Sequence, residues 1–216
     1  MARIAIIGGH GKIARLATPL LVADGHQVTA LIRNPDHTED VTEGGARALV
    51  ADVEHMTTDE IAEALTGHDV VVWSAGAGGG SPERTRAVDH DAAVRSMDAA
   101  AAAGIDRYVM VSYFGAGPNH GVEKDNPFYA YAEAKAAADT HLRDTDLTWT
   151  ILMPSTLTDD PGTGTIDTAA EKASEVPRAD VAAVIAAVLA ADDSVTARRD
   201  IPFNTGDTPI TEAITG

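Results

Sequence analysis

Short apolar runs alternate with longer segments of helical spacing along the first 155 residues of the chain. The strand-like runs lie at residues 3–8, 26–33, 46–52, 69–76, 107–113 and 147–155. Helical spacing follows at residues 11–25, 81–104 and 128–144. Two of the runs, "DVVVW" and "YVMV", are apolar at consecutive positions, which is typical of strands buried on both faces of a parallel sheet. The alternation predicts an α/β fold with a Rossmann-like, doubly wound parallel sheet.

The pattern loosens after Pro154. Residues 155–177 are rich in loop-forming residues and indicate at most one short strand, and a helix near 179–191 and a strand near 199–206 follow. We expect a single domain over residues 1–216, in which residues 154–216 form a small cap on the substrate side of the sheet.

Composition supports a folded core and narrows the setting. The chain has 216 residues, 44% of them hydrophobic, and its mean hydropathy is -0.06. It has no cysteine, which excludes disulfides, thiolate metal sites and cysteine nucleophiles. The N-terminus reads directly into a strand, and the longest apolar run, residues 181–191, is too short to cross a bilayer. We therefore expect a cytoplasmic protein without a membrane partner.

The formal net charge is -17, and no basic cluster offsets it. A field of this sign repels nucleic acid phosphates, so the expected partner is a small-molecule substrate and not a nucleic acid. We expect a monomer or a homodimer.

The first strand is followed by a turn rich in small residues. Gly8, Gly11 and Ala14 give the spacing G-x-x-G-x-x-A, and Lys12 and Ile13 fill the first positions of the helix. Small residues permit a tight turn and close approach of a pyrophosphate to the free N–H groups of the helix. The motif of P-loop NTPases is not met, because Lys12 is followed by Ile13 rather than by Ser or Thr. The turn predicts a dinucleotide site that includes these five residues.

Arg33 indicates which dinucleotide is bound. An NAD site usually has an acidic residue at the end of the second strand, where this chain has Arg33. A guanidinium group binds a 2′-phosphate through its fork of donors, so we predict NADP(H) as the preferred cofactor. Asp36 lies close enough in sequence that NAD(H) stays open.

The next strand ends supply weaker indications. Asp52 and Val53 follow the third strand, where they can flank an adenine. Ala75 and Gly76 follow the fourth strand, where small residues let a cofactor pass.

In order along the chain, "GGHGKIA", "LIRNP", "ADV", "RYVMVSYFGAG", "YAEAK" and "ILMPSTLTDDPGTGTI" resemble the atypical short-chain dehydrogenase/reductase family. The resemblance is to its NAD(P)H-binding members close to the NmrA-like and the flavin and biliverdin reductase-like groups, and it covers essentially the whole chain. It implies a Rossmann fold, an NADP(H) site and often reductase activity, but no substrate.

The resemblance also implies roles for particular residues. Ser112, Tyr131 and Lys135 match the family's catalytic Ser, Tyr and Lys, with Lys135 also holding the nicotinamide ribose. The segment that approaches the nicotinamide matches Pro154, Ser155 and Thr156. Two positions depart from the family pattern: Tyr113 stands where many members have a second serine, and Asp89 where related enzymes often carry Asn.

Tyr131 and Lys135 are four residues apart and so share one helix face. Hydride transfer to a carbonyl carbon requires a proton at the oxygen, and a free tyrosine has a pKa near 10. We expect the Lys135 ammonium and a bound nicotinamide to lower the pKa of Tyr131, and Ser112 to orient the substrate oxygen.

No spacing of the 8 histidines matches a metal motif, and no G-x-S-x-G sequence supports a hydrolase. Three functions stay open: an NADP(H)-dependent oxidoreductase acting on a small carbonyl, quinone or flavin-like compound, a non-catalytic NADP(H) sensor, and an NAD-dependent sugar-nucleotide epimerase or dehydratase. Tyr131 with Lys135 favours the first, and the short tail disfavours the third.

Overall fold

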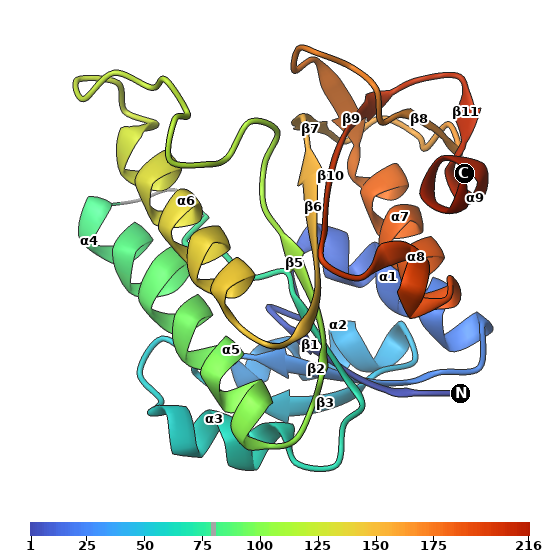
Figure 1. Ribbon diagram of the computed structural model, residues 1–216. Coiled ribbons are helices and arrows are strands. Elements are labelled where there is room, and N and C mark those ends of the chain that lie inside the picture. Colours follow the sequence, from blue (N-terminus) through green and yellow to red (C-terminus); the bar gives the residue numbers. More distant parts are fainter. Residues whose placement is uncertain (79–80) are drawn as a thin grey trace.

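The computed structural model describes residues 1–78 and 81–216. Its centre is a sheet in which seven strands run parallel, in the order β3-β2-β1-β4-β5-β6-β10 (Figure 1). These strands are β3 (Arg47–Val50), β2 (Gln27–Ile32), β1 (Arg3–Ile7), β4 (Val70–Trp73), β5 (Arg107–Val111), β6 (Thr148–Pro154) and β10 (Arg199–Thr205). The predicted Rossmann-like α/β fold is confirmed.

Helices cover both faces of the sheet, as Figure 1 shows. One face carries α1 (Lys12–Ala23), α2 (Thr38–Glu43), α7 (Arg178–Ala190) and α9 (Ile210–Thr215). The other carries α3 (Thr58–Leu65), α4 (Pro82–Thr85), the π-helix η2 (Arg86–Ala92), α5 (Ala93–Ala102) and α6 (Tyr129–Asp144). The short helices η1 (Pro35–His37) and α8 (Asp193–Thr196) lie in connections.

The two layers explain why the strands are apolar at consecutive positions. In β1, Ile4 and Ile6 pack towards α1 and α7, whereas Ala5 and Ile7 pack towards α3 and α5. Successive side chains of a strand point to opposite faces, so both faces need apolar residues when helices cover both.

The C-terminal tail differs from the expected cap. Residues 155–177 hold three short strands instead of at most one: β7 (Thr156–Thr158), β8 (Thr165–Asp167) and β9 (Glu175–Pro177). β7 pairs with β9, while β8 pairs antiparallel with β10 and with β11 (Thr208–Pro209). The tail therefore contributes a parallel strand and an antiparallel extension to the main sheet as well as a covering segment.

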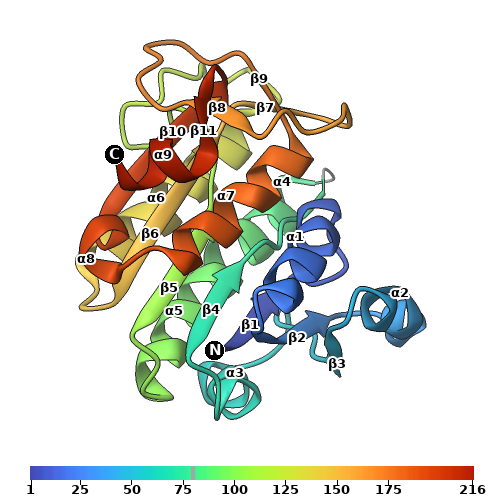
Figure 2. The ribbon, with the colours of Figure 1, turned by 90° about the vertical axis from the view of Figure 1, so that its right-hand side faces the viewer.

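Helix α7 lies beside α1 on the same face of the sheet (Figure 2). Val181, Val184, Ile185 and Val188 of α7 are fully buried. In the described part of the chain, no helix is long and apolar enough to span a membrane.

The strand order reverses between β1 and β4. Ligands of open α/β sheets bind at such a point, beyond the C-terminal ends of the strands. A ligand site is therefore expected at the loops after β1 and β4.

Candidate functional site

In the turn after β1, Gly8 and Gly11 lie close to neighbouring backbone atoms. Gly8 has φ +83°, and a Cβ built on it would lie 2.6 Å from the backbone of Ala75, so the turn lies directly against the end of β4. Gly11 precedes the twelve-residue helix α1, and a Cβ there would lie 3.1 Å from the Gly8 carbonyl oxygen and 3.5 Å from that of Ser74. A helix N-terminus leaves backbone N–H groups free, and bare backbone lets a phosphate approach them. This cradle fits the diphosphate of a dinucleotide.

A cavity of about 310 Å³ opens beside this turn. Its wall is made by the turn and by the ends of β2, β3 and β4. Seven of the predicted cofactor-binding residues line it: Gly8, Gly11, Arg33, Asp52, Val53, Ala75 and Gly76. We call it the nucleotide cavity.

Two guanidinium groups meet one carboxylate in the nucleotide cavity. Arg33 Nη1 lies 3.4 Å from Glu54 Oε2, and Arg84 Nε lies 3.6 Å from the same oxygen. All three residues line the cavity, whereas Asp36 does not. Neither Glu54 nor Arg84 was predicted from the sequence, and Arg84 is distant from Arg33 in sequence because it comes from α4. A phosphate can lie between the guanidinium groups of Arg33 and Arg84 if it displaces the Glu54 carboxylate.

Two histidines also line the nucleotide cavity. The rings of His10 and His37 stack with centroids 3.6 Å apart, and His10 Nε2 lies 2.8 Å from Asp40 Oδ2. Neither histidine was predicted from the sequence to have a role in this site. The stack forms the wall next to Asn34.

A second cavity, of about 670 Å³, adjoins the first. The two share Ser74, Ala75 and Gly76 of the loop after β4. The second cavity is lined by Ile13 of α1, the end of β5, η2, the start of α6 and Leu157 of β7. Since Ser112 and Tyr131 face it, we call it the substrate cavity.

Ser112 and Lys135 are fixed by partners other than Tyr131. Ser112 Oγ donates to Asp139 Oδ2 at 2.5 Å. Lys135 Nζ donates to the Val111 carbonyl oxygen at 2.9 Å and lies 3.3 Å from Met110 Sδ. Lys135 is 1% exposed and lies behind the wall of the substrate cavity, not in it.

The electrostatics of Tyr131 differ from the expectation. Burial raises the pKa of its phenol above the ordinary value, and the carboxylates of Asp89 and Asp139 raise it further. The expected lowering by Lys135 is not found, because that ammonium faces Val111 and the two carboxylates. Burial in turn lowers the pKa of Lys135, against the opposing effect of Asp139 and Asp89. Tyr131 is thus a phenol that keeps its proton at neutral pH.

Asp139 stands behind Ser112 on the next turn of α6. Burial raises the pKa of its carboxyl group, while Lys135 and Ser112 oppose that rise. Its second oxygen, Oδ1, is buried and has no hydrogen-bond partner among the described residues. Asp139 was not predicted, although it continues the four-residue spacing of Tyr131 and Lys135.

Asp89 is a buried carboxylate that lines the substrate cavity from η2. Its Oδ2 accepts a hydrogen bond from the Ala77 N–H at 3.1 Å. Burial raises its pKa, and the charge of Lys135 and the Ala77 N–H oppose this. π-Helical turns occur often at functional sites, so the local structure agrees with a role here. In the sequence, Asp89 stood out only as a departure from a family pattern.

Six predicted residues lie outside the lining of both cavities: Lys12, Ala14, Lys135, Pro154, Ser155 and Thr156. Lys12 Nζ pairs with Asp159 Oδ2 at 2.6 Å, and Ala14 is buried against the sheet. Ser155 is buried and its hydroxyl is hydrogen-bonded to Asn204. None of the three residues of the predicted nicotinamide segment lines the substrate cavity; the residue that follows them, Leu157, does.

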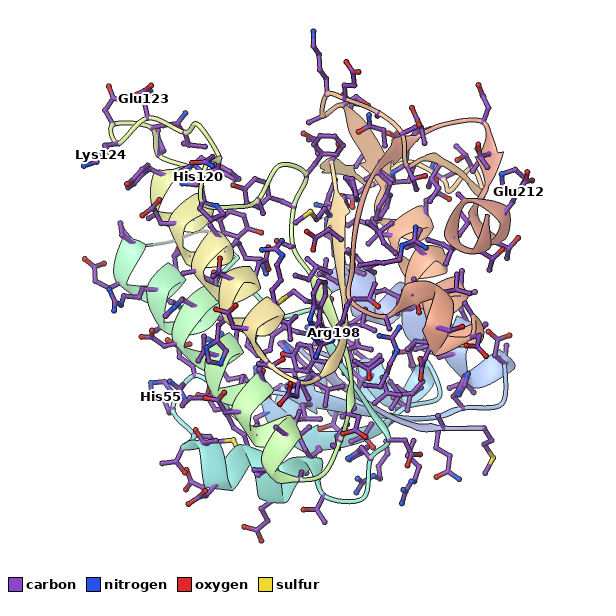
Figure 3. All side chains as sticks on the ribbon, viewed as in Figure 1. His55, His120, Glu123, Lys124, Arg198 and Glu212 are labelled. Carbon is purple, nitrogen blue, oxygen red and sulfur yellow. The ribbon has the colours of Figure 1, made fainter. Side chains whose placement is uncertain are left out.

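The loop between β5 and α6 lies over the start of α6. His120 Nε2 lies 2.8 Å from Glu133 Oε1, while Glu123 and Lys124 point outward at the end of the molecule (Figure 3). Across residues 1–78 and 81–216, no three His, Asp or Glu side chains are grouped so that they could hold a metal ion.

Comparisons with known proteins agree with this geometry. The family model described as NAD(P)H-binding matches residues 8–192. The chain is 36% identical to the "uncharacterized sugar epimerase YhfK" of Bacillus subtilis, over 98% of each chain.

Two solved structures superpose closely. A putative NAD-dependent epimerase/dehydratase from Bacillus halodurans gives a TM-score of 0.90 at 29% identity, over 99% of each chain. The oxidoreductase ylbE from Lactococcus lactis gives 0.87 at 29% identity, over 98% of this chain and 94% of that one.

Proposed function

Because this chain belongs to the NAD(P)H-binding family, we propose that it is an NADP(H)-dependent oxidoreductase that reduces a small carbonyl, quinone or flavin-like compound. One observation carries the proposal: the two cavities adjoin along Ser74, Ala75 and Gly76. A molecule that spans this loop has one end near Arg33 and the other near Tyr131. That is the layout required of a dinucleotide whose reactive ring meets a substrate.

The residues of the nucleotide cavity fit NADPH. The bare turn at Gly8 and Gly11 holds the diphosphate, and Arg33 with Arg84 holds the 2′-phosphate. NADPH supplies a hydride when it is bound. NADP(H) is preferred over NAD(H) in this proposal because no acid stands at the end of β2 within the nucleotide cavity as described.

Tyr131 supplies the proton in the proposed reaction. Its phenol is protonated at neutral pH and faces the substrate cavity, where it donates to the heteroatom of the substrate. Ser112 Oγ donates its hydrogen bond to Asp139, so it presents oxygen lone pairs to the cavity and can accept a hydrogen bond from a donor there. Lys135 stabilises the carboxylates of Asp89 and Asp139, which hold this arrangement.

Epimerisation is the second candidate, since one relative and one solved structure carry that name. A sugar nucleotide brings a diphosphate of its own into the substrate cavity. In the part of the chain that the structure describes, the lining of this cavity includes no Lys, Arg or His side chain to hold one. This favours reduction of a small compound over epimerisation of a sugar nucleotide.

A screen of carbonyls, quinones and flavins tests the proposal, with NADPH absorbance followed in the presence and absence of each compound. We expect oxidation of NADPH with at least one class. Tight NADPH binding with no turnover of any class supports a sensor, and interconversion of sugar-nucleotide epimers without net NADPH oxidation supports an epimerase.

A further inference from the structure

The charge in the lining of the substrate cavity, as the structure describes it, is negative. Its walls are mostly apolar, with Ile13, Val111, Phe128 and Leu157 contributed by four different elements. Among the described residues of the lining, Asp89 is the one that carries a formal charge.

The nearest cations, Lys135 and Arg84, favour the charged form of Asp89 but do not reach the lining of the substrate cavity. Lys135 is 1% exposed and donates to the Val111 carbonyl oxygen. Arg84 Nη1 donates to the Ala77 carbonyl oxygen at 2.6 Å, and its Nε faces Glu54 in the nucleotide cavity. Lys12 pairs with Asp159, and Lys124 points outward on its loop (Figure 3). None of the four lines the substrate cavity.

Asp89 is held where the two cavities meet. The Ala77 N–H fixes its Oδ2, and its Oδ1 lies 3.0 Å from the position that a Cβ on Gly76 would occupy. Gly76 belongs to both cavities. A substrate that approaches this junction meets the carboxylate in a partly desolvated setting, where like charges repel more strongly than in water.

We propose that the substrate cavity takes uncharged carbonyl or quinone compounds, and that Asp89 is the residue that rejects anionic ones. This inference rests on the proposed function, because it names the substrate class of the same site. The net charge of -17 acts in the same direction at longer range.

The test compares a matched pair of ligands, naphthoquinone and naphthoquinone sulfonate, by equilibrium dialysis in the presence of NADP⁺, so that no turnover occurs. The chain has no cysteine, so quinone adducts at thiols do not interfere. We expect the uncharged quinone to bind at least about tenfold more tightly, given the cost of like-charge juxtaposition.

Asp89→Asn keeps an oxygen that can accept from the Ala77 N–H and removes the charge. The variant should bind the sulfonate more tightly than the wild-type protein does and bind the uncharged quinone within about twofold of the wild-type affinity. The preference for the uncharged quinone should therefore become smaller. Asp91→Asn is the matched control, because Asp91 lies in the same π-helix, pairs with His90 and does not line the cavity. Asp91→Asn should leave the affinity for both quinones unchanged. If Asp89→Asn does not fold, Ala130→Lys adds a cation to the cavity wall and should improve sulfonate binding.

Equal or tighter binding of the sulfonate by the wild-type protein overturns the inference, as does failure of both quinones to bind at their solubility limits. An unchanged preference in folded Asp89→Asn removes the role of Asp89. Selective binding of the uncharged quinone without NADPH oxidation in any screen sinks the proposed function but leaves the charge selectivity standing. Turnover of both quinones with similar KM supports the proposed function but contradicts the charge selectivity.

Discussion

At the scale of single residues, the proposed preference for NADP(H) depends on a 2′-phosphate replacing Glu54 as the partner of Arg33 and Arg84. The Arg33–Glu54 contact is 3.4 Å long and the side chain of Arg33 is 57% exposed, so this pair is weak and solvent-screened. A bound phosphate offers three charged oxygens to the same guanidinium and displaces the carboxylate at little cost.

Arg33→Ala should therefore weaken NADPH binding by about 1.5–3 kcal/mol, the range for hydrogen bonds to charged groups, and change NADH binding much less. Glu54→Gln is the companion variant. This variant removes the charge that pairs with both guanidinium groups, so the affinity for NADPH should rise. Fluorescence titration with the two cofactors measures each effect, and an equal loss for both cofactors in Arg33→Ala rules out the 2′-phosphate role.

The proton on Tyr131 leads to a prediction about pH. Asp139 is one of the charges that raise the pKa of this phenol, so removing it in Asp139→Asn stabilises the phenolate and lowers that pKa. Reduction needs the phenol, so its rate falls as pH rises through the pKa of Tyr131. The alkaline fall should begin at lower pH in Asp139→Asn, with a shift of up to about one pH unit.

The control for this profile is Asp144→Asn, an exposed carboxylate on the same helix. It changes the net charge equally and should leave the profile unchanged. An alkaline limb that stays in place in Asp139→Asn, or moves to higher pH, contradicts the assigned electrostatics.

The sequence was informative for some of these residues and silent about others. Gly8, Gly11 and Arg33 sit at strand ends, and the strand order of a doubly wound sheet puts such ends together. The partners of Lys135 depend on how α6 packs against β5, which brings Nζ to the Val111 carbonyl oxygen. No spacing along the chain contains that packing, so the sequence suggested a lowering of the pKa of Tyr131 by Lys135 that the structure does not show.

At the scale of elements, the core strands follow from their apolar runs, whereas short elements do not. β7, β8 and β9 have three residues each, too few for a periodic pattern. The turn that leads into β8 is held by a side chain from another element: Asp180 of α7 accepts hydrogen bonds from the Thr163 and Gly164 N–H groups at 3.0 and 2.8 Å. Helix α3 was missed although its capping box, Thr57 with Glu60, is a signal readable in "TTDE".

The turn between β1 and α1 gives a prediction at this scale. The backbone of Gly11, with φ -60° and ψ 151°, is open to any residue, so Gly11→Val should fold. Its side chain would sit between the Gly8 and Ser74 carbonyl oxygens and block the diphosphate, so binding of NADPH and of NADH should both be lost. Gly117→Val is the control, because a Cβ there meets nothing within 4 Å. Unchanged affinity in a folded Gly11→Val protein, measured by titration and circular dichroism, removes the dinucleotide site.

At the scale of the whole molecule, acidic residues act in two ways: some form ion pairs that hold the tail, and others repel one another. Lys12 and Arg178 both pair with Asp159, which ties the first turn of α1 to the tail next to the substrate cavity. Among the described residues, most of the other Asp and Glu side chains form no ion pair, and at a net charge of -17 they repel one another. The cofactor-free protein should therefore gain stability with salt, since screening reduces this self-repulsion.

Thermal unfolding without cofactor measures that gain. The Tm should rise as NaCl is increased from a few millimolar to roughly the physiological range, where the Debye length falls to about 8 Å. A Tm that falls over this range would show that the attractive pairs outweigh the repulsion.

Transfer of deuterium from NADPH labelled at the nicotinamide C4 position tests the proposed function most directly. With a carbonyl compound found in the screen, the label should appear on the carbinol carbon of the alcohol that the wild-type protein forms. In Tyr131→Phe the rate of transfer should fall by roughly 10²–10⁴, the share of general acid catalysis, while NADPH affinity stays within a few-fold. Absence of the label from every alcohol product, or an undiminished rate in Tyr131→Phe with a carbonyl acceptor, would contradict a nicotinamide-dependent reduction centred on Tyr131.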